Sequence, residues 1–387
     1  MIRVFINGLP AGNRSGTGRY TAELLRALAR LEAADARFIA LIEADFPYRD
    51  ELQASGVFEM IPQPRRPSAT RVLWEAFALS GMAHHLKLDV FHAPAFIAPS
   101  RLPCPSVVTL HDCAFLRCGE TIHLLRRLYY RRAIPRSARQ AALVAIDSES
   151  TRRDAMELMG LPSAKLRVVP LGVGEDFFVR EVPTPREVEL RNRIDVERDF
   201  ILTTGALEPR KNLETLIRAY ARLRVLDSSV PPLVIAGRRA WRWKRLEALA
   251  QNLGVSDRVR FPGYVADADL PFLLALATVF VCVSRYEGFG LPPLEAMAAG
   301  TPALVSNASS LPEVVGGAGV MVEPDDIEAI ARGLLSLLRD REKRAKLAEA
   351  GRRRAREYPW DRVARSMLEL YREAAAGGQS SKFKVQG

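Results

Sequence analysis

The sequence contains little cysteine and no long apolar segment, and each shortage excludes a class of protein. Four cysteines among 387 residues are too few for a disulfide-stabilised scaffold and are typical of a reducing compartment. The longest apolar run, residues 270–283, contains Pro271 and is shorter than the roughly 18 residues that a membrane-spanning helix needs. The N-terminal run is cut off by Asn7 and Gly8 and is too brief for a signal peptide. We therefore expect a soluble cytoplasmic protein without a transmembrane segment.

The composition is otherwise that of a globular protein with a basic charge balance. Hydrophobic residues make up 48% of the chain and charged residues 26%, which is ample material for more than one core. The net charge of +11 attracts anions such as nucleic acid, anionic lipid or phosphorylated small molecules. Composition does not choose among these partners, so the choice depends on where the polar residues lie.

Short apolar runs alternate with helical stretches in two consecutive blocks. Expected strands cover residues 2–6, 106–110 and 143–146 in the first block, and 200–204, 233–236, 258–261, 279–283, 303–305 and 320–322 in the second. Their continuous apolar character is typical of strands buried on both faces of a parallel sheet. The charged, Pro-containing residues 179–199 predict a linker with a short exposed helix. We therefore predict two doubly wound, Rossmann-like α/β domains, residues 1–180 and 195–358, facing a central cleft, with a disordered tail at 377–387.

Glycines and polar residues gather where predicted strands end, which is the edge at which open parallel sheets bind ligands. Gly16, Gly18 and Arg19 follow the first strand and precede a helix, so backbone N–H groups there can approach an anion. The segment is neither a G-x-G-x-x-G fingerprint nor a P-loop, and a plain strand-to-helix turn is an equal alternative.

A second cluster follows the predicted strand at residues 200–204. It contains Gly205 and the adjacent cations Arg210 and Lys211, with Asn212 as the expected N-cap of the next helix. Two cations at a helix start oppose the helix dipole, and a bound phosphate would resolve that conflict. The alternative is a pair of solvated surface cations, and we favour the phosphate interpretation.

The third cluster follows residues 279–283 and is the longest pattern. Gly288 and Gly290 form a loop whose N–H groups can point outward, and two prolines suit the first turn of the following helix. Glu287 lies at the strand end and Glu295 about one turn into that helix, so both carboxylates can edge one concavity and bind sugar and ribose hydroxyls. Glu295 as a residue that only satisfies the helix dipole is the alternative, but capping requires no pattern of this length.

His111 ends another strand, and its neighbours Cys113, Cys118 and His123 raise the question of a metal site. Their spacing matches no zinc pattern and contains no C-x-x-C pair. Residues 267–269 match the D-x-D pattern that metal-dependent transferases use, but they precede an expected helix, and we interpret them as capping residues. The sequence thus predicts no metal and no bound cofactor.

These segments together resemble the retaining GT-B glycosyltransferases of family GT4, over nearly the whole chain. Residues 287–295, within EGFGLPPLEAMAAGTP, resemble the family's E-x7-E motif. Residues 205–212 resemble its donor-phosphate segment, and residues 109–112 resemble its active-site histidine segment. Residues 169–173 resemble the segment before the inter-domain crossing. Residues 358–361 resemble the start of a last helix, about 361–376, that returns to pack on the N-terminal domain.

The resemblance implies a hexosyltransferase that uses a nucleoside-diphosphate sugar as co-substrate. Arg210 and Lys211 would neutralise the diphosphate, while Glu287 would bind the sugar. The residues that the resemblance assigns to catalysis are His111, Glu287, Arg210 and Lys211. Those that it assigns to donor binding are Gly16, Gly18, Arg19, Gly205, Arg210, Lys211, Tyr264, Val265, Glu287, Gly288, Phe289, Gly290, Leu291 and Glu295, with the base near Tyr264 and Val265 and the ribose on Glu295.

The charge requirement of the reaction agrees with this assignment. A departing diphosphate accumulates negative charge, which two cations and a helix N-terminus can compensate without a metal. No carboxylate pair of the glycosidase type is evident. We therefore expect a metal-independent, retaining transfer in which the leaving phosphate takes the acceptor proton. The segments resemble most closely mannosyl- or rhamnosyltransferases of bacterial surface polysaccharide such as lipopolysaccharide, which favours GDP-mannose as donor, with a UDP-sugar as the alternative.

Residues 122–140 combine six arginines with leucines and tyrosines. A basic amphipathic helix of this kind suits an anionic membrane surface at the inner face of the cytoplasmic membrane, where a polyprenyl-linked glycan acceptor would lie; a solvated basic face is an equal alternative.

The net charge also suggests a nucleic-acid-binding protein, but no zinc finger, RNA-recognition motif or basic zipper supports one, so we expect no nucleic-acid partner. A non-catalytic sugar-binding scaffold is the remaining rival.

Overall fold

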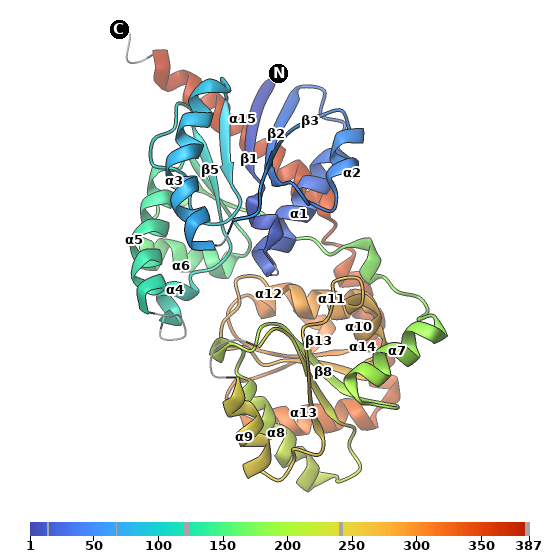
Figure 1. The fold of residues 1–387 in the computed structure, drawn as a ribbon. Helices are drawn as coiled ribbons and strands as arrows, with labels where there is room; N and C mark the ends of the chain where they lie inside the picture. Colours follow the sequence, from blue (N-terminus) through green and yellow to red (C-terminus); the bar gives the residue numbers. More distant parts are fainter. Residues whose placement is uncertain (14, 67, 120–123, 240–242, 384–387) are drawn as a thin grey trace. The chain divides into compact units, whose positions relative to one another are not determined.

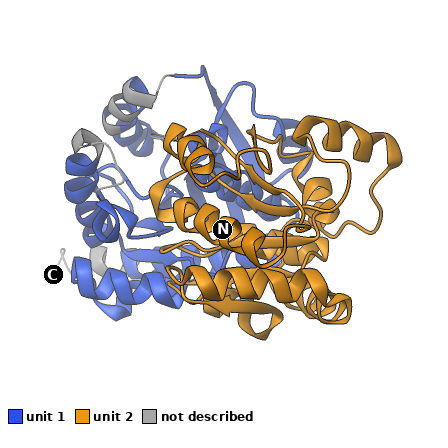
Figure 2. Ribbon diagram, turned by 90° about the horizontal axis from the view of Figure 1, so that it is seen from below, with its two compact units in different colours: residues 1–172, 360–387 blue, residues 173–359 orange. Residues whose placement is uncertain are grey.

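The computed structural model describes residues 1–13, 15–66, 68–119, 124–239 and 243–383. They form two compact units: Met1–Gly172 with Trp360–Gly387, called unit 1, and Val173–Pro359, called unit 2 (Figure 2). Each unit is an α/β domain with a parallel sheet, as the continuous apolar runs predicted. The chain leaves unit 1 at residue 172 rather than 180.

The sheet of unit 1 has seven strands in the order β3-β2-β1-β4-β5-β6-β7. Their bounds are β1 Ile2–Asn7, β2 Ala36–Glu43, β3 Phe58–Gln63, β4 Val90–Ala93, β5 Ser106–Leu110, β6 Leu143–Ile146 and β7 Leu166–Val168. All neighbouring strands are parallel, and the order reverses between β1 and β4. Parallel sheets bind ligands beside such a reversal, and the glycine-containing loop after β1 lies there.

Helices cover both faces of this sheet (Figure 1). Their bounds are α1 Gly16–Ala29, α2 Arg49–Ala54, α3 Ser68–His85, α4 Ala114–Arg117, α5 Leu124–Gln140, α6 Glu149–Met159 and α15 Trp360–Phe383. The core on one face joins apolar side chains of α3, α5 and α6 to those of the strands. On the other face α1 and α15 pack against each other, and α15 packs on β1, β4, β5 and β6.

Helix α15 completes unit 1 although it follows unit 2 in the sequence. Its apolar face, which includes Val363, Met367 and Tyr371, is buried. Ion pairs with Arg30 and Asp35 join this helix to the first part of the chain. The helix continues through Phe383 and so includes residues 377–383 of the expected tail; residues 384–387 lie outside the described part.

The sheet of unit 2 has six parallel strands in the order β10-β9-β8-β11-β12-β13. Their bounds are β8 Ile201–Thr204, β9 Leu233–Ala236, β10 Val259–Gly263, β11 Val279–Cys282, β12 Ala303–Ser306 and β13 Gly319–Val322. The reversal of order lies between β8 and β11. The two motif-bearing loops predicted from the sequence follow these two strands, so tertiary structure makes them neighbours.

Seven helices in the described part of unit 2 surround its sheet, and an eighth lies where a linker was predicted. Their bounds are α7 Thr184–Ile194, α8 Leu213–Leu226, α9 Lys244–Asn252, α10 Leu270–Leu276, α11 Leu291–Ala299, α12 Leu311–Val315, α13 Ile327–Arg339 and α14 Arg341–Ala355. The short helix expected within residues 179–199 is α7, in which most residues are exposed while Leu190 and Ile194 are buried within unit 2. None of the helices in the described residues combines the length and apolarity of a membrane span.

Candidate active site

The site of unit 2 is assembled from the segments that follow β8 and β11. These strands are paired in register, with Val279 opposite Ile201. Beyond them, the backbone N–H of Arg285 donates to the carbonyl oxygen of Arg210 at 2.9 Å, which ties the two loops together. Side chains that lie 76 positions apart in the sequence therefore meet at one edge of the sheet.

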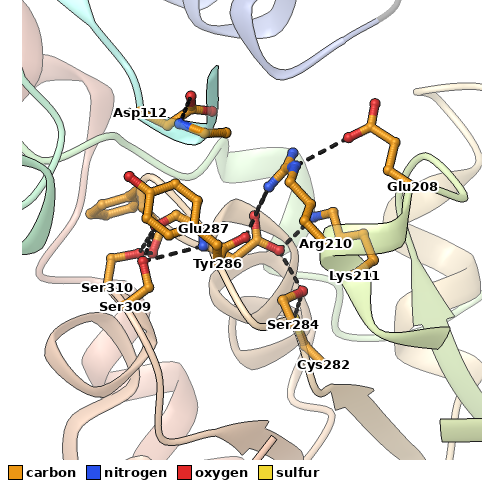
Figure 3. A network of polar contacts seen from close by, with 12 residues as sticks. Asp112, Glu208, Arg210, Lys211, Cys282, Ser284, Tyr286, Glu287, Ser309 and Ser310 are labelled. Carbon is orange, nitrogen blue, oxygen red and sulfur yellow. Dashed lines mark hydrogen bonds and ion pairs between the residues drawn. The ribbon is translucent and has the colours of Figure 1, made fainter. Parts of the chain in front are cut away.

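Glu287 is the centre of this site and receives both predicted cations (Figure 3). Lys211 Nζ donates to Oε1 at 2.6 Å, and Arg210 Nη1 donates to Oε2 at 2.9 Å. Arg210 also donates through Nε to Glu208 at 3.1 Å, and through Nη1 to the carbonyl oxygen of Tyr286 at 3.1 Å. The structure thus places the paired cations and Glu287 together at one edge of the sheet.

The balance between burial and ion pairing decides the charge of Glu287. Its side chain is only 7% exposed, and burial by itself would raise its pKa. The charges of Lys211 and Arg210, with hydrogen bonds from Lys211 and Ser284, outweigh burial and lower the pKa of Glu287 to about 2. The carboxylate is therefore ionised at neutral pH and can accept hydrogen bonds from hydroxyl groups.

Three serines that sequence reasoning missed shape the loop around Glu287. Ser284 Oγ donates to Glu287 Oε1 at 2.7 Å. Ser309 accepts from the backbone N–H of Glu287 at 3.2 Å and donates to its carbonyl oxygen, while Ser310 donates to the carbonyl oxygen of Phe289 at 2.6 Å. Ser309 and Ser310 follow β12, the neighbour of β11, so their place after a predicted strand was the signal that could have indicated them.

Backbone conformation explains the glycine that precedes α11. Gly290 has φ +119°, and a Cβ there would lie 2.9 Å from Leu311 Cδ2, so a larger residue is strained and crowded. No side chain caps α11 at Gly290, and its first turn contains Pro292 as predicted. A helix start without a side-chain cap favours an anion. Glu295 is buried in this helix.

The segment after β8 differs from its prediction at Asn212. Its backbone is left-handed, with φ +58°, and its side chain does not cap α8. The amide donates instead to the carbonyl oxygen of Pro324 at 2.6 Å, which anchors the loop before α13. Gly205, also left-handed at φ +128°, lies against the Lys211 side chain. A small pocket beside these residues is lined by Thr203, Thr204, Gly205, Ala206, Lys211, Leu213, Ile235, Ala236, Cys282 and Ser284.

Tyr264 and Val265 follow β10, on the same edge of the sheet but two strands away from β8. Val265 is buried, and the carbonyl oxygen of Tyr264 accepts from Arg193 at 2.7 Å. Asp269, in the D-x-D pattern, stands at the N-cap position of α10. Contrary to the prediction, its side chain makes no capping hydrogen bond to the helix. Its carboxylate pairs with Arg186 and Arg193 of α7, because two cations are stronger partners than a backbone N–H group.

In unit 1 the loop after β1 leads into α1 at Gly16. Ser15 caps this helix by accepting from the N–H of Gly18 at 3.4 Å, and a Cβ at Gly18 would overlap the carbonyl oxygen of Asn13. Glycine is therefore required at position 18 by close backbone packing. Arg19 lies in the first turn of α1.

His111, at the end of β5, has partners on both ring nitrogens. Nδ1 is 2.7 Å from Oδ2 of Asp147, and Nε2 donates to the carbonyl oxygen of Pro94 at 2.8 Å. Sequence reasoning missed Asp147, which directly follows β6, the strand paired with β5. Cys113 and Cys118 have no disulfide bond, and His123 lies outside the described residues. No group of three or more His, Cys, Asp or Glu side chains in the described part is arranged to hold a metal ion.

Comparisons with known proteins identify the family. The model described as "Glycosyltransferase Family 4" matches residues 14–177, and "Glycosyl transferases group 1" matches residues 187–354. O-antigen chain mannosyltransferase B of Escherichia coli is 31% identical over 376 residues, covering 92% of this chain and 96% of that protein. The MMP alpha-(1->4)-mannosyltransferase of Mycolicibacterium hassiacum is 36% identical over 258 residues, covering 65% of this chain and 59% of that protein.

Solved structures agree on the fold. HepE of Anabaena, in complex with UDP and glucose, superposes with a TM-score of 0.73 at 19% identity, covering 96% of this chain and 100% of that one. WaaG, a glycosyltransferase involved in lipopolysaccharide biosynthesis, superposes with a TM-score of 0.71 at 20% identity, covering 96% and 99%. With both family models matched in succession and two parallel-sheet units in place, the chain belongs to the GT4-family glycosyltransferases and has their GT-B fold.

Proposed function

We propose that this glycosyltransferase moves a mannosyl residue from GDP-mannose to a glycan or lipid-linked glycan acceptor in the synthesis of bacterial O-antigen-type polysaccharide. Support for the sugar comes from relatives whose names state mannosyl transfer, including the Escherichia coli protein that matches nearly the full length. A UDP-sugar is the alternative donor, and the UDP complex of the structural neighbour HepE motivates it.

The observation that carries the proposal is the triad of Arg210, Lys211 and Glu287. Two cations share one buried carboxylate, so the triad has a net charge of +1 and attracts an anion. A diphosphate that engages the cations leaves the oxygens of Glu287 for sugar hydroxyls. Glu208, which is 35% exposed, pairs with Arg210 at 3.1 Å and is the partner that a phosphate oxygen would replace.

We propose a retaining, metal-independent transfer. The bond between the anomeric carbon and the phosphate oxygen breaks with its electron pair on the phosphate. The acceptor hydroxyl oxygen bonds to the same face of that carbon, and its proton passes to the leaving phosphate. Arg210 and Lys211 stabilise the negative charge that develops, and preorganised charges of this kind supply a large part of catalysis. In the same proposal Glu295 binds ribose, Tyr264 and Val265 lie near the base, and the loop of Gly16, Gly18 and Arg19 contributes to phosphate binding.

A donor assay tests the proposal. Purified enzyme, incubated with GDP-mannose or UDP-sugars and a mannose-terminated acceptor, is expected to prefer GDP-mannose, to remain active in EDTA, and to give product with the anomeric configuration of the donor by NMR. The double variant R210A/K211A is expected to lose about 100-fold or more of kcat/KM. K346A/R353A removes the same two residue types from exposed positions on α14 and is the matched control.

Three results would contradict parts of this proposal. Exclusive use of a UDP-sugar favours the alternative donor. An inverted anomeric configuration rules out retention, and loss of activity in EDTA rules out metal independence. Equal activity of R210A/K211A and its control removes the triad from the reaction.

We also propose that unit 1 contacts anionic membrane at the cytoplasmic face through the surface of α3 and α5, called here the α3–α5 surface. Leu128 and Tyr129 of α5 are 44% and 41% exposed, and Phe77 of α3 is 80% exposed. Glu75 of α3 influences the pKa of Tyr129, which places the two helices together (Figure 1). The exposed arginines of α5 that accompany them are Arg131, Arg132, Arg136 and Arg139. Of the predicted segment 122–140, residues 122 and 123 and the side chains of 124–126 lie outside the described part. Nucleic acid is not a proposed partner.

A further inference from the structure

The contacts of His111 determine where its protons lie. The Pro94 carbonyl oxygen can only accept a hydrogen bond, so Nε2 of His111 carries a proton. Nδ1 lies 2.7 Å from Asp147 Oδ2, and one proton occupies that contact. If the proton belongs to the ring, His111 is an imidazolium beside a carboxylate; if it belongs to Asp147, both groups are neutral.

Hydrogen-bond acceptors on both ring nitrogens favour the ionised pair, although burial opposes it. Asp147 is 2% exposed and its Oδ1 has no hydrogen-bond partner among the described residues, so burial raises the pKa of Asp147 above its ordinary value. The charge and the hydrogen bond of His111 act in the opposite direction and stabilise the carboxylate. Burial by itself would lower the pKa of His111, but the charge and hydrogen bond of Asp147 outweigh burial, and the pKa is raised.

The ring is also held in place by aromatic neighbours. Tyr20 meets it edge-to-face with ring centres 4.7 Å apart, and Phe96 does so at 5.4 Å. Phe96 has a left-handed backbone with φ +66°, which is strained for an aromatic residue. Such strain persists where the surrounding structure requires it and is found preferentially at functional sites.

A buried chain of hydrogen bonds supports Tyr20 from behind. Its hydroxyl lies 3.1 Å from Thr109 Oγ1, which lies 2.9 Å from His92 Nε2, and His92 Nδ1 lies 2.8 Å from the hydroxyl of Tyr371 on α15. Burial and the charge of His111 lower the pKa of His92 to about 3, so that ring is neutral. The charge at this end of unit 1 is therefore concentrated on His111 and its carboxylate neighbours.

We propose that Asp147 is a positioning residue of the transfer reaction: its carboxylate keeps a proton on Nδ1 of His111 and, together with the Pro94 carbonyl, fixes the ring as an oriented cation. The proposal rests on the proposed function, because it assigns His111 to the transfer. The titratable groups that face His111 are Asp147 from the end of β6, Asp112 next in the chain, Tyr20 from α1 and His92 from β4. Of these four groups, Asp147 is the carboxyl group within hydrogen-bond distance of the ring.

The isosteric variant D147N tests the role of this carboxylate. The chain has five histidines, so selective ¹⁵N-histidine labelling with H111Q for assignment resolves the His111 ring. We expect both ring nitrogens of wild-type His111 to be protonated at about pH 7.5 and Nδ1 to lose its proton in D147N. We also expect kcat to fall about tenfold or more while the donor KM changes little, and activity to decline at lower pH than in the wild type.

The sign of the pH effect follows from the raised pKa. Protonation of His111 is complete below the ordinary histidine pKa of 6.5 and is lost as the pH rises through the higher folded value. At the acid end the interaction is lost where Asp147, whose pKa burial raises, takes up a proton. Without the Asp147 carboxylate, burial alone acts on His111 and lowers its pKa, so the ring loses its proton at a lower pH.

D154N is the matched control, because Asp154 is a buried carboxylate of the same unit that pairs with Arg117 at 2.6 Å. It is expected to lower stability without changing the His111 protons or the pH profile. A wild-type ring with a single proton at about pH 7.5 overturns the proposal even if D147N does not fold, and so does a D147N enzyme with wild-type kcat and pH profile. Absence of mannosyl transfer by the wild type contradicts the proposed function instead, and the NMR result still decides the state of His111.

Discussion

At the scale of single residues, the site depends on charges that burial would suppress unless they were paired. Glu287 remains ionised because two cations and a serine hydroxyl contact its carboxylate. A carboxylate that accepts hydrogen bonds therefore lies beside two cations. This is the combination that the proposed nucleoside-diphosphate sugar requires. The same pairing makes the stability of unit 2 depend on pH.

The pH dependence of unfolding tests this pairing. The pKa of Glu287 falls from 4.5 to about 2, a difference of about 3 kcal/mol in favour of the ionised form. This contribution is complete above the unfolded pKa of 4.5 and is lost as the pH falls towards 2. We expect E287Q to lower the free energy of unfolding by about 2–4 kcal/mol at about pH 7, because Arg210 and Lys211 lose their shared partner.

Urea unfolding of both proteins at about pH 7 and about pH 3 provides the measurement. The difference between wild type and E287Q is expected to shrink at the lower pH. A difference that stays constant contradicts the assignment of a low pKa to Glu287.

At the scale of secondary-structure elements, the residues proposed to be functional lie where neighbouring strands end. β8 and β11 carry the triad, and β5 and β6 carry His111 and Asp147. Strands β8 and β11 are neighbours in the sheet although they are distant in the sequence. The loops that follow them are short. Helices α3 and α5 of unit 1 present a different kind of surface, in which exposed apolar and basic side chains lie together.

Vesicle flotation tests the α3–α5 surface. We expect binding to vesicles that contain anionic phosphatidylglycerol and little binding to phosphatidylcholine alone, because cations and exposed apolar side chains act together. F77A is expected to weaken binding several-fold. V225A removes an apolar side chain of similar exposure, 74%, from α8 of unit 2 and is expected to bind like the wild type. Binding that does not depend on anionic lipid argues against the proposal.

At the scale of the whole molecule, the chain enters unit 2 at Val173 and leaves it at Pro359, and these two residues form a parallel bridge. The N–H of Val173 donates to the carbonyl oxygen of Tyr358 at 2.8 Å, so the ends of unit 2 lie together. Unit 2 is therefore a self-contained insertion with its own sheet and core. A ligand of its triad should stabilise this unit as a folded body.

Thermal unfolding with nucleotides tests that expectation. A ligand at about 100 times its Kd stabilises the native state by about 2.7 kcal/mol. We expect GDP to raise the unfolding midpoint of the wild type and of K346A/R353A, but not of R210A/K211A. A larger shift with UDP favours the alternative donor, and an equal shift in all three proteins places the nucleotide away from the triad.

Local patterns in the chain were enough to predict the parallel α/β class and the glycine-containing loops after three strands. These features depend on apolar runs and backbone conformation, which are set by neighbours in the sequence. The expected strands did not include β2, β3, β4 or β7, although most of their residues are apolar. The capping roles expected for Asn212 and Asp269 were wrong, because each side chain found a partner from another segment.

What only the folded chain decided is which polar groups meet. Asp147 lies 36 positions from His111, and Ser309 lies 22 positions from Glu287. Each pair meets because strand order makes their loops adjacent, and spacing along the chain does not encode strand order. A buried polar group bonds to the strongest partner within reach in space, so the choice of partner is settled by tertiary packing.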